Sequence, residues 1–348
     1  MKVTQVLCAA GPVDAVTNQG LACRALFTAW GWEGEDYSAV IAPGMPRGTL
    51  RPLHELQPRD GELLLLHYSG YARGLEPLFS SRRRSMLISH NITPARYFWA
   101  HEPVEGVRCE LARDQLAVLC REAGALAGVS RFNAHELTAC SGREADVIPV
   151  LFDRVALPPA GDGPPAGPPT ILFVGRLAPH KRQDLVIRAF ARFRAAEPEA
   201  RLVLVGTPLS PAYGVHLQEL ADELAPGGVV FESGVSRDRL AEHYRSAHAF
   251  LCLSEHEGFC IPLLEAFHFG VPVIARDEGA VGEVVGDAGV LLGADDNLEV
   301  VAELLRIVTC DTELRGELRP RGERRLDEYA FARTSERLHD ALTTVAGR

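Results

Sequence analysis

The chain has 348 residues, a formal net charge of −10 and 47% hydrophobic residues. The apolar content is sufficient for folded cores and excludes a disordered chain, and the length predicts two domains of ordinary size. The negative charge argues against a nucleic-acid-binding surface, which needs a basic face.

The N-terminus and the cysteines favour a reduced, cytoplasmic protein. Met1-Lys2-Val3 leads directly into a strand-like segment and lacks the basic region and long apolar stretch of a signal peptide. No apolar run approaches the roughly 20 residues that span a bilayer. The eight cysteines show no zinc-type spacing, so we expect free thiols, most of them buried.

Short apolar runs alternate with helix-periodic segments along the chain, which predicts parallel sheets covered by helices. In the first half, the expected strands are Val3–Ala9, Tyr37–Ala42, Glu62–Tyr68, Ser85–His90, Leu126–Ser130 and Asp146–Val150. In the second half, they are Thr170–Val174, Arg201–Val205, Val229–Glu232, Ala249–Ser254 and Val271–Ala275.

The strongest boundary signal is the segment 158–169, in which six prolines and three glycines exclude a helix or a central strand. We therefore expect an N-terminal domain at 1–157, this linker, and a C-terminal domain at 170–328. A last helix at 329–348 is free to pack back on the N-terminal domain. The predicted fold class is α/β, with two Rossmann-like doubly wound domains that face each other across a cleft.

The first chemistry-bearing segment follows the strand at 170–174. Gly175 permits close backbone approach, and Arg176 and Lys181 lie in the loop that leads into the next helix. Two cations beyond a strand end suit a phosphate or a diphosphate. The alternative is two ordinary surface cations. Against it, the chain has only two lysines among its 36 basic residues, and one of them is Lys181.

The second segment runs from Ser254 to Glu265. Pro262 suits the start of a helix, so the N–H groups of Phe259, Cys260 and Ile261 would point outwards as an anion site. Glu257 and Glu265 are placed to face the two ends of one ligand. The alternative for such carboxylates is that they complement the helix dipole.

These segments resemble the family-4 retaining glycosyltransferases, which have the glycosyltransferase-B architecture. The matching motifs are F-V-G-R-x-x-x-x-K at 173–181, L-V-L-V-G at 202–206, S-x-x-E-G-F-x-x-P-x-L-E-A at 254–266 and G-V-P-V-I-A at 270–275. The resemblance is close over about residues 170–310 and looser in the first half.

The resemblance implies roles for these residues. Arg176 and Lys181 would hold the donor diphosphate next to Gly175, and Glu265 would bind the ribose hydroxyls. Glu257, with the backbone at 259–261, would hold the donor sugar and the distal phosphate. Electrostatic stabilisation of the leaving diphosphate would then be the largest catalytic contribution.

In the first half, His90 matches the family histidine that contacts the donor sugar; a solvent-exposed or capping histidine is the alternative. His67 and Tyr68 are weaker candidates on the same sheet, and we expect Tyr68 on the acceptor side. The loop at 10–20 departs from the glycine-rich loop of the family, although Gly11 is suitably placed. In that loop, Asp14 and Asn18 are acceptor-side candidates, and Asp14 could equally cap the following helix.

Together these features predict a metal-independent, retaining glycosyltransferase that needs no cofactor beyond a UDP-, GDP- or ADP-sugar donor. The expected acceptor is a sugar or glycolipid in cell-envelope or exopolysaccharide synthesis, and peripheral membrane contact stays open. The alternatives are a natural-product glycosyltransferase, a nucleotide-sugar epimerase of the same architecture, and a binding protein without catalysis. The base, the sugar, the acceptor and the oligomeric state cannot be read from the sequence.

Overall fold

The computed structural model describes residues 1–79, 83–161, 165–294 and 297–347. It divides into two compact units. The N-terminal unit comprises residues 1–99, 103–151 and 331–348, and the C-terminal unit comprises 100–102 and 152–330. The expected linker at 158–169 thus lies inside the C-terminal unit, and its residues 162–164 lie outside the described residues.

The described part of the N-terminal unit contains a parallel sheet with the strand order β3-β2-β1-β4-β5-β6-β7. Its strands are β1 (Val3–Leu7), β2 (Asp36–Ser38), β3 (Arg51–Pro52), β4 (Leu63–Tyr68), β5 (Ser85–Ser89), β6 (Ala125–Gly128) and β7 (Asp146–Val147). Its α-helices are α1 (Ala15–Ala29), α2 (Pro103–Glu122), α3 (Arg131–Ser141) and α11 (Phe331–Ala346). Every residue of the central strand β4 is buried, as expected for a parallel strand covered on both faces.

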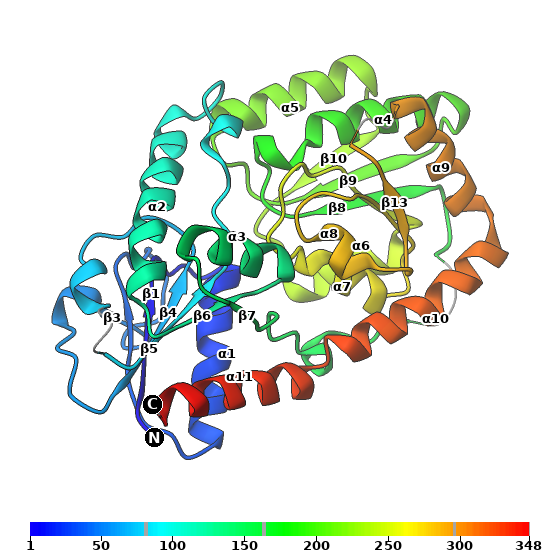
Figure 1. Cartoon of the computed structure of the whole chain (residues 1–348). Helices are drawn as coiled ribbons and strands as arrows, with labels where there is room; N and C mark the ends of the chain where they lie inside the picture. The colour runs from blue at the N-terminus through cyan, green and yellow to red at the C-terminus, as the bar shows by residue number, and fades with distance from the viewer. Residues whose placement is uncertain (80–82, 162–164, 295–296, 348) are drawn as a thin grey trace. The chain divides into compact units, whose positions relative to one another are not determined.

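The described part of the C-terminal unit contains a second parallel sheet, with the order β10-β9-β8-β11-β12-β13. Its strands are β8 (Thr170–Val174), β9 (Arg201–Val205), β10 (Val229–Glu232), β11 (Ala249–Cys252), β12 (Val273–Arg276) and β13 (Val290–Leu292). Its α-helices are α4 (Gln183–Ala196), α5 (Pro211–Leu224), α6 (Arg237–Ser246), α7 (Ile261–His268), α8 (Val281–Val285), α9 (Leu298–Cys310) and α10 (Thr312–Glu328) (Figure 1).

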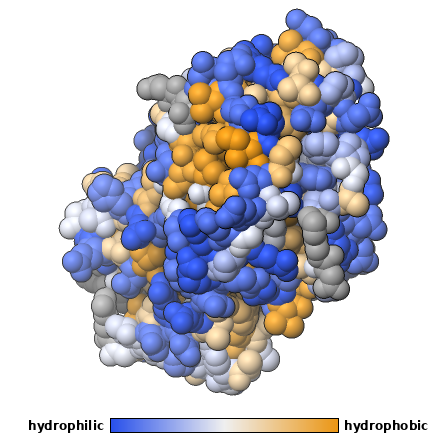
Figure 2. Space-filling view, turned by 90° about the vertical axis from the view of Figure 1, so that its right-hand side faces the viewer, coloured by the Kyte–Doolittle hydropathy of each residue, from blue (hydrophilic) through white to orange (hydrophobic). Residues whose placement is uncertain are grey.

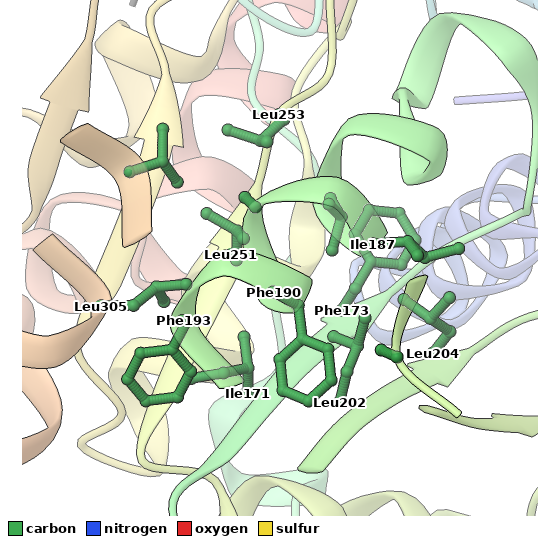
Figure 3. Packing of buried hydrophobic residues seen from close by; sticks show 14 of the residues in the cluster. Ile171, Phe173, Ile187, Phe190, Phe193, Leu202, Leu204, Leu251, Leu253 and Leu305 are labelled. Carbon is green, nitrogen blue, oxygen red and sulfur yellow. The ribbon is translucent and has the colours of Figure 1, made fainter. Parts of the chain in front are cut away.

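The core of the C-terminal unit explains why these helices cover the sheet. Val186, Phe190 and Phe193 recur at helical spacing on α4, and all three are buried in one cluster with Ile171 and Leu202 of the strands. Figure 3 shows Phe190 and Phe193 among these strand residues. Burying a Phe or Val side chain contributes about 1.5–3 kcal/mol, so this one helix face fixes α4 firmly on the sheet.

On the face shown in Figure 2, hydrophilic residues cover most of the area and hydrophobic residues gather in smaller patches. Within the described residues, none of the helices has the length and apolar character needed to cross a bilayer.

Candidate functional site

The strand order of each unit predicts which edge of its sheet can bind a ligand. In the C-terminal unit the chain adds β9 and β10 on one side of β8, then crosses to β11 on the other. Ligands of open α/β sheets bind beyond the carboxyl ends of the strands at such a switch point. The loops that follow β8 and β11 are the two segments singled out by the sequence, at 175–182 and 253–260.

Two glycines shape the loop after β8. Gly175 has φ +148°, a conformation that favours glycine. A Cβ on Gly206, after β9, would lie 1.8 Å from the carbonyl oxygen of Gly175, so only glycine fits there. Hydrogen bonds such as Leu177 N–H to the Thr207 carbonyl (3.1 Å) tie the two loops together. The backbone that carries Arg176 is therefore well fixed.

Arg176 itself is exposed, and no described residue accepts a hydrogen bond from its guanidinium or pairs with it. Its backbone carbonyl accepts from the Gln183 side chain (3.1 Å). An exposed guanidinium on a fixed backbone can bind an anion without first breaking another ion pair. This placement suits an anionic ligand such as a diphosphate.

Lys181 and Glu257 form an ion pair across this edge. The Lys181 Nζ lies 2.6 Å from Glu257 Oε1, and their side chains are 17% and 9% exposed. Burial opposes the ammonium charge, but Glu257 and the neighbouring Cys260 and Cys252 together outweigh this effect, and the pKa of Lys181 is raised. The Ser254 hydroxyl donates to the same carboxylate oxygen (2.8 Å). Lys181 is therefore charged and held at the strand end.

The backbone of Glu257 is supported by Gly279, which follows β12. Gly279 has φ +63°, and a Cβ there would lie 2.3 Å from the Glu257 carbonyl oxygen. The Ala280 N–H donates to that same carbonyl (2.9 Å). The position of Glu257 thus depends on a glycine from a third strand end, which the sequence analysis did not identify.

Helix α7 begins next to this ion pair. Cys260 is its N-cap residue, with φ +72° and no side-chain capping bond. No described residue accepts a hydrogen bond from the N–H groups of Phe259, Cys260 and Ile261. Open N–H groups at a helix N-terminus form an anion site without a basic side chain.

Glu265 lies one turn further along α7 and is half-buried. The Tyr244 hydroxyl of α6 donates to Glu265 Oε2 (2.6 Å), and the Tyr244 ring stacks on Phe269 with centroids 5.1 Å apart. Burial raises the pKa of Glu265, and the bond from Tyr244 lowers it in part. Tyr244 therefore positions one carboxylate oxygen and leaves the other for a ligand.

In the N-terminal unit, the switch point lies between β1 and β4, and His90 follows the next strand, β5. The Nε2 atom of His90 lies 3.0 Å from Nδ1 of His67, and Nε2 of His67 lies 2.9 Å from the Gln5 side-chain oxygen. Burial lowers the pKa of His67 to about 4. Burial, followed by the neighbouring His67, lowers the pKa of His90 well below its usual range. Both rings are neutral at pH 7.

The hydrogen bonds fix both tautomers. The Gln5 amide nitrogen donates to the Gly20 carbonyl (3.0 Å) and to Asp36 (2.8 Å), so the Gln5 oxygen must accept from His67 Nε2–H. The neutral His67 then has a lone pair on Nδ1, which accepts from His90 Nε2–H. His90 is left with an unprotonated Nδ1, an acceptor suited to a sugar hydroxyl.

The other candidates in the first half have different placements. Tyr68 is fully buried and its hydroxyl donates to the Ala112 carbonyl (2.6 Å), which corrects its assignment as an acceptor contact. Asp14 accepts from the N–H and the hydroxyl of Thr17 (both 2.7 Å), so the structure favours its helix-capping alternative. The Gly11 N–H donates to the Thr17 hydroxyl (3.0 Å), and Asn18 is exposed on α1.

The structure brings together Lys181 with Glu257 and His67 with His90, within their own units. Sequence reasoning missed Gln5, Tyr244 and Gly279. Gln5 stands among buried strand residues, where a polar side chain is itself a signal. Nothing near Tyr244 or Gly279 in the sequence indicates which carboxylate or carbonyl each one meets.

Comparison with known proteins gives a consistent result. Residues 160–325 match the family described as "Glycosyl transferases group 1". A D-inositol 3-phosphate glycosyltransferase from Acidothermus cellulolyticus is 34% identical over 157 residues, which is 42% of this chain and 35% of that protein. The chain spans about a third to two fifths of the length of the first curated relatives that it matches.

Solved structures match over the full length. Sucrose-phosphate synthase from Thermosynechococcus elongatus has a TM-score of 0.75 and 18% identity over 99% of this chain and 98% of its own. The Anabaena protein HepE, in complex with UDP and glucose, has a TM-score of 0.70 and 17% identity over 99% and 100%. These likenesses confirm the predicted fold class, two Rossmann-like domains of the glycosyltransferase-B architecture; the cleft stays a prediction.

Proposed function

Because residues 160–325 of this chain match the family described as "Glycosyl transferases group 1", we propose that the chain is a retaining glycosyltransferase that uses a nucleoside-diphosphate-sugar donor. The observation that carries the proposal is the arrangement beyond β8 and β11. There, the Lys181–Glu257 pair (2.6 Å) lies beside an open helix N-terminus. Arg176, which pairs with no described residue, stands on the same loop as Lys181.

Each group has a part in binding the donor. Arg176 and Lys181 bind the diphosphate, and the N–H groups at 259–261 bind its distal phosphate. Glu257 accepts hydrogen bonds from the sugar, and Glu265, oriented by Tyr244 (2.6 Å), accepts from the ribose hydroxyls. His90 accepts a sugar hydroxyl at its unprotonated Nδ1.

In the proposed reaction, the acceptor oxygen forms a bond to the anomeric carbon on the face from which the diphosphate leaves. The carbon–oxygen bond to the phosphate breaks, and a diphosphate oxygen takes the proton of the attacking hydroxyl. Negative charge grows on the diphosphate, where Lys181 and Arg176 stabilise it. Glu257 is paired with Lys181 and Ser254, which suits a positioning role better than that of a general base. No step needs a metal, so we expect turnover to persist in EDTA.

The proposed acceptor is a sugar, glycolipid or other hydroxyl compound in cell-envelope glycan synthesis, in a cytoplasmic setting. The relatives named D-inositol 3-phosphate glycosyltransferase add that phosphorylated cyclitol to the acceptors worth testing. A natural-product acceptor is the second choice, by the family resemblance alone.

The first experiment is a thermal-shift panel of UDP, GDP, ADP and their common sugars. A specific ligand at 100 times its dissociation constant should stabilise the protein by about 2.7 kcal/mol. Glu265→Ala should lose this stabilisation, whereas Glu299→Ala, at an exposed carboxylate of α9, should retain it. Unchanged donor affinity in the Glu265 variant would refute the proposed ribose contact.

The second experiment is turnover with the best donor and a panel of acceptors. A transferase gives the sugar–acceptor product with the anomeric configuration of the donor. Inversion at the anomeric carbon would disprove the retaining mechanism, and conversion of the donor sugar without an acceptor would identify an epimerase.

A further inference from the structure

Two cysteines and a carboxylate converge at the end of β11, and the proposed reaction uses neither thiol. Cys252 is the last residue of β11, and Cys260 is the N-cap of α7. The sulfur atoms of both and a carboxylate oxygen of Glu257 all lie within 4.8 Å of one another. Both thiols are free in the structure.

This cluster already surrounds a positive charge. The Lys181 ammonium contacts Glu257 Oε1 at 2.6 Å, and the Lys181 side chain is only 17% exposed. A group of ligands that stabilises one buried cation is suited to another, provided that it fits the available space.

Access and chemistry favour a soft metal. Cys252 is almost fully buried, whereas Cys260 is half-buried, so a small ion can approach from the side of Cys260. Two thiolates and a carboxylate are ligands that zinc-class cations prefer, at about 2.3 Å for sulfur and about 2.0 Å for oxygen. Because the three atoms lie within 4.8 Å of one another, they need to close by at most roughly 1 Å to reach this geometry.

We propose that Cys252, Glu257 and Cys260 bind a thiophilic divalent cation such as Zn²⁺, which displaces the ammonium of Lys181. On binding, both thiols release a proton to solvent, and no group is oxidised or reduced. Solvent completes the coordination. The cation takes Glu257 from Lys181 and occupies the edge of the sheet where the diphosphate would bind. It therefore inhibits donor binding, a consequence that rests on the proposed function.

The chain provides a matched control for the two thiols. Cys120 and Cys140 have their sulfur atoms 3.4 Å apart in the N-terminal unit. Among the described residues, no carboxylate or imidazole joins them in a three-ligand group. A pair of neighbouring thiols alone should therefore bind the cation more weakly than the proposed site.

The test uses the full chain, stripped with a chelator and kept reduced. Cd²⁺ is the probe, because its bonds to thiolates absorb in the ultraviolet, and Zn²⁺ is then titrated against a chromophoric chelator. We expect one tight equivalent in the wild type. Cys260→Gly, Cys252→Ser and Glu257→Gln should each bind the cation at least about 10- to 100-fold more weakly than the wild type. Loss of only an outer hydrogen-bond partner already weakens a metal site by roughly that factor. Cys140→Ser should bind as the wild type does.

Cys260→Gly is the decisive variant, because glycine adopts φ +72° without strain and the variant should fold. Wild-type cadmium absorption in Cys260→Gly, or its loss in Cys140→Ser, would overturn the proposed site. Metal uptake is measured without nucleotide, so the result does not depend on the proposed reaction. Zn²⁺ should also raise the dissociation constant of UDP in the wild type and not in Cys260→Gly. The same UDP affinity with and without Zn²⁺ would overturn the displacement of Lys181.

Discussion

The two units share one strand order around their switch points, β3-β2-β1-β4-β5-β6 and β10-β9-β8-β11-β12-β13, but they place different chemistry there. The N-terminal unit presents neutral groups, a chain from Gln5 through His67 to His90. The C-terminal unit presents charges, with Lys181 and Glu257 at 2.6 Å. The same topology thus carries two kinds of site, and the side chains that each unit places there, rather than the fold, decide which.

The largest effect should follow from removal of the charge in the C-terminal unit. We expect Lys181→Met to lower kcat by about 100- to 1,000-fold, because the diphosphate loses a cation in the transition state. Lys181→Arg should recover part of it. The control for a merely structural role is Lys181→Met with Glu257→Gln, which leaves no unpaired carboxylate. If that double variant regained wild-type turnover, the lysine would only be balancing Glu257.

The neutral His67–His90 pair should change how the free energy of unfolding depends on pH. With its pKa lowered from 6.5 to about 4, His67 makes the unfolded state bind more protons between these values. The neutral His67 therefore contributes to the free energy of unfolding above pH 6.5, and this contribution is lost as the pH falls towards 4. The loss should reach about 2 kcal/mol by pH 5.

The three tryptophans, Trp30, Trp32 and Trp99, all belong to the N-terminal unit, so their fluorescence during urea unfolding reports on that unit. His67→Gln, which does not titrate, should show a smaller decrease in stability between pH 7.5 and pH 5 than the wild type. The same decrease in both proteins would mean that His67 is not held neutral by burial.

A smaller effect should come from Tyr244, which orients a carboxylate in the C-terminal unit. Tyr244→Phe removes the hydroxyl 2.6 Å from Glu265 Oε2 and keeps the stacked ring. A hydrogen bond to a charged group contributes about 1.5–3 kcal/mol, so the dissociation constant of the nucleotide should rise about tenfold or more. Tyr213→Phe, another buried tyrosine of the same unit, is the control and should bind normally. An equal change in both variants would indicate a general loss of packing.

The sequence predicted the C-terminal unit better than the N-terminal unit for physical reasons. The strands Thr170–Val174, Arg201–Val205 and Val229–Glu232 are confirmed to the residue, because each is an apolar run bounded by glycine, proline or charge. The edge strands β3 (Arg51–Pro52) and β13 (Val290–Leu292), one in each unit, were both missed, since such short and mostly exposed or half-buried strands carry too little apolar pattern.

The candidate site residues, too, could be predicted only in part from the sequence. Local motifs singled out Lys181 and Glu257, because Lys181 lies in the loop that begins with Gly175 after β8, and Glu257 lies beside Gly258 in the loop after β11. Contacts between distant segments could not be predicted. Tyr68 resembles a site residue in the sequence, but in the structure its hydroxyl donates to the Ala112 carbonyl of α2. Gly279 acquires its role only where its backbone meets Glu257.

The smallest expected effect tests whether the hydrogen bonds from Gln5 through His67 to His90 contribute to turnover and not only to packing. Gln5→Met removes the oxygen that accepts from His67 Nε2–H (2.9 Å) and frees His67 to carry its proton on Nδ1. In that tautomer, His67 Nδ1–H faces His90 Nε2, so His90 must move its own proton to Nδ1 and lose its acceptor. A net hydrogen bond contributes about 0.5–1.5 kcal/mol, so kcat should fall about two- to tenfold. Nucleotide affinity should stay unchanged, because the nucleotide groups lie in the other unit.

Nitrogen NMR of the imidazoles reads the tautomers directly: His90 should be protonated at Nε2 in the wild type and mixed in Gln5→Met. If both proteins showed the same His90 tautomer while kcat fell, Gln5 would act through packing and not through the proton of His90.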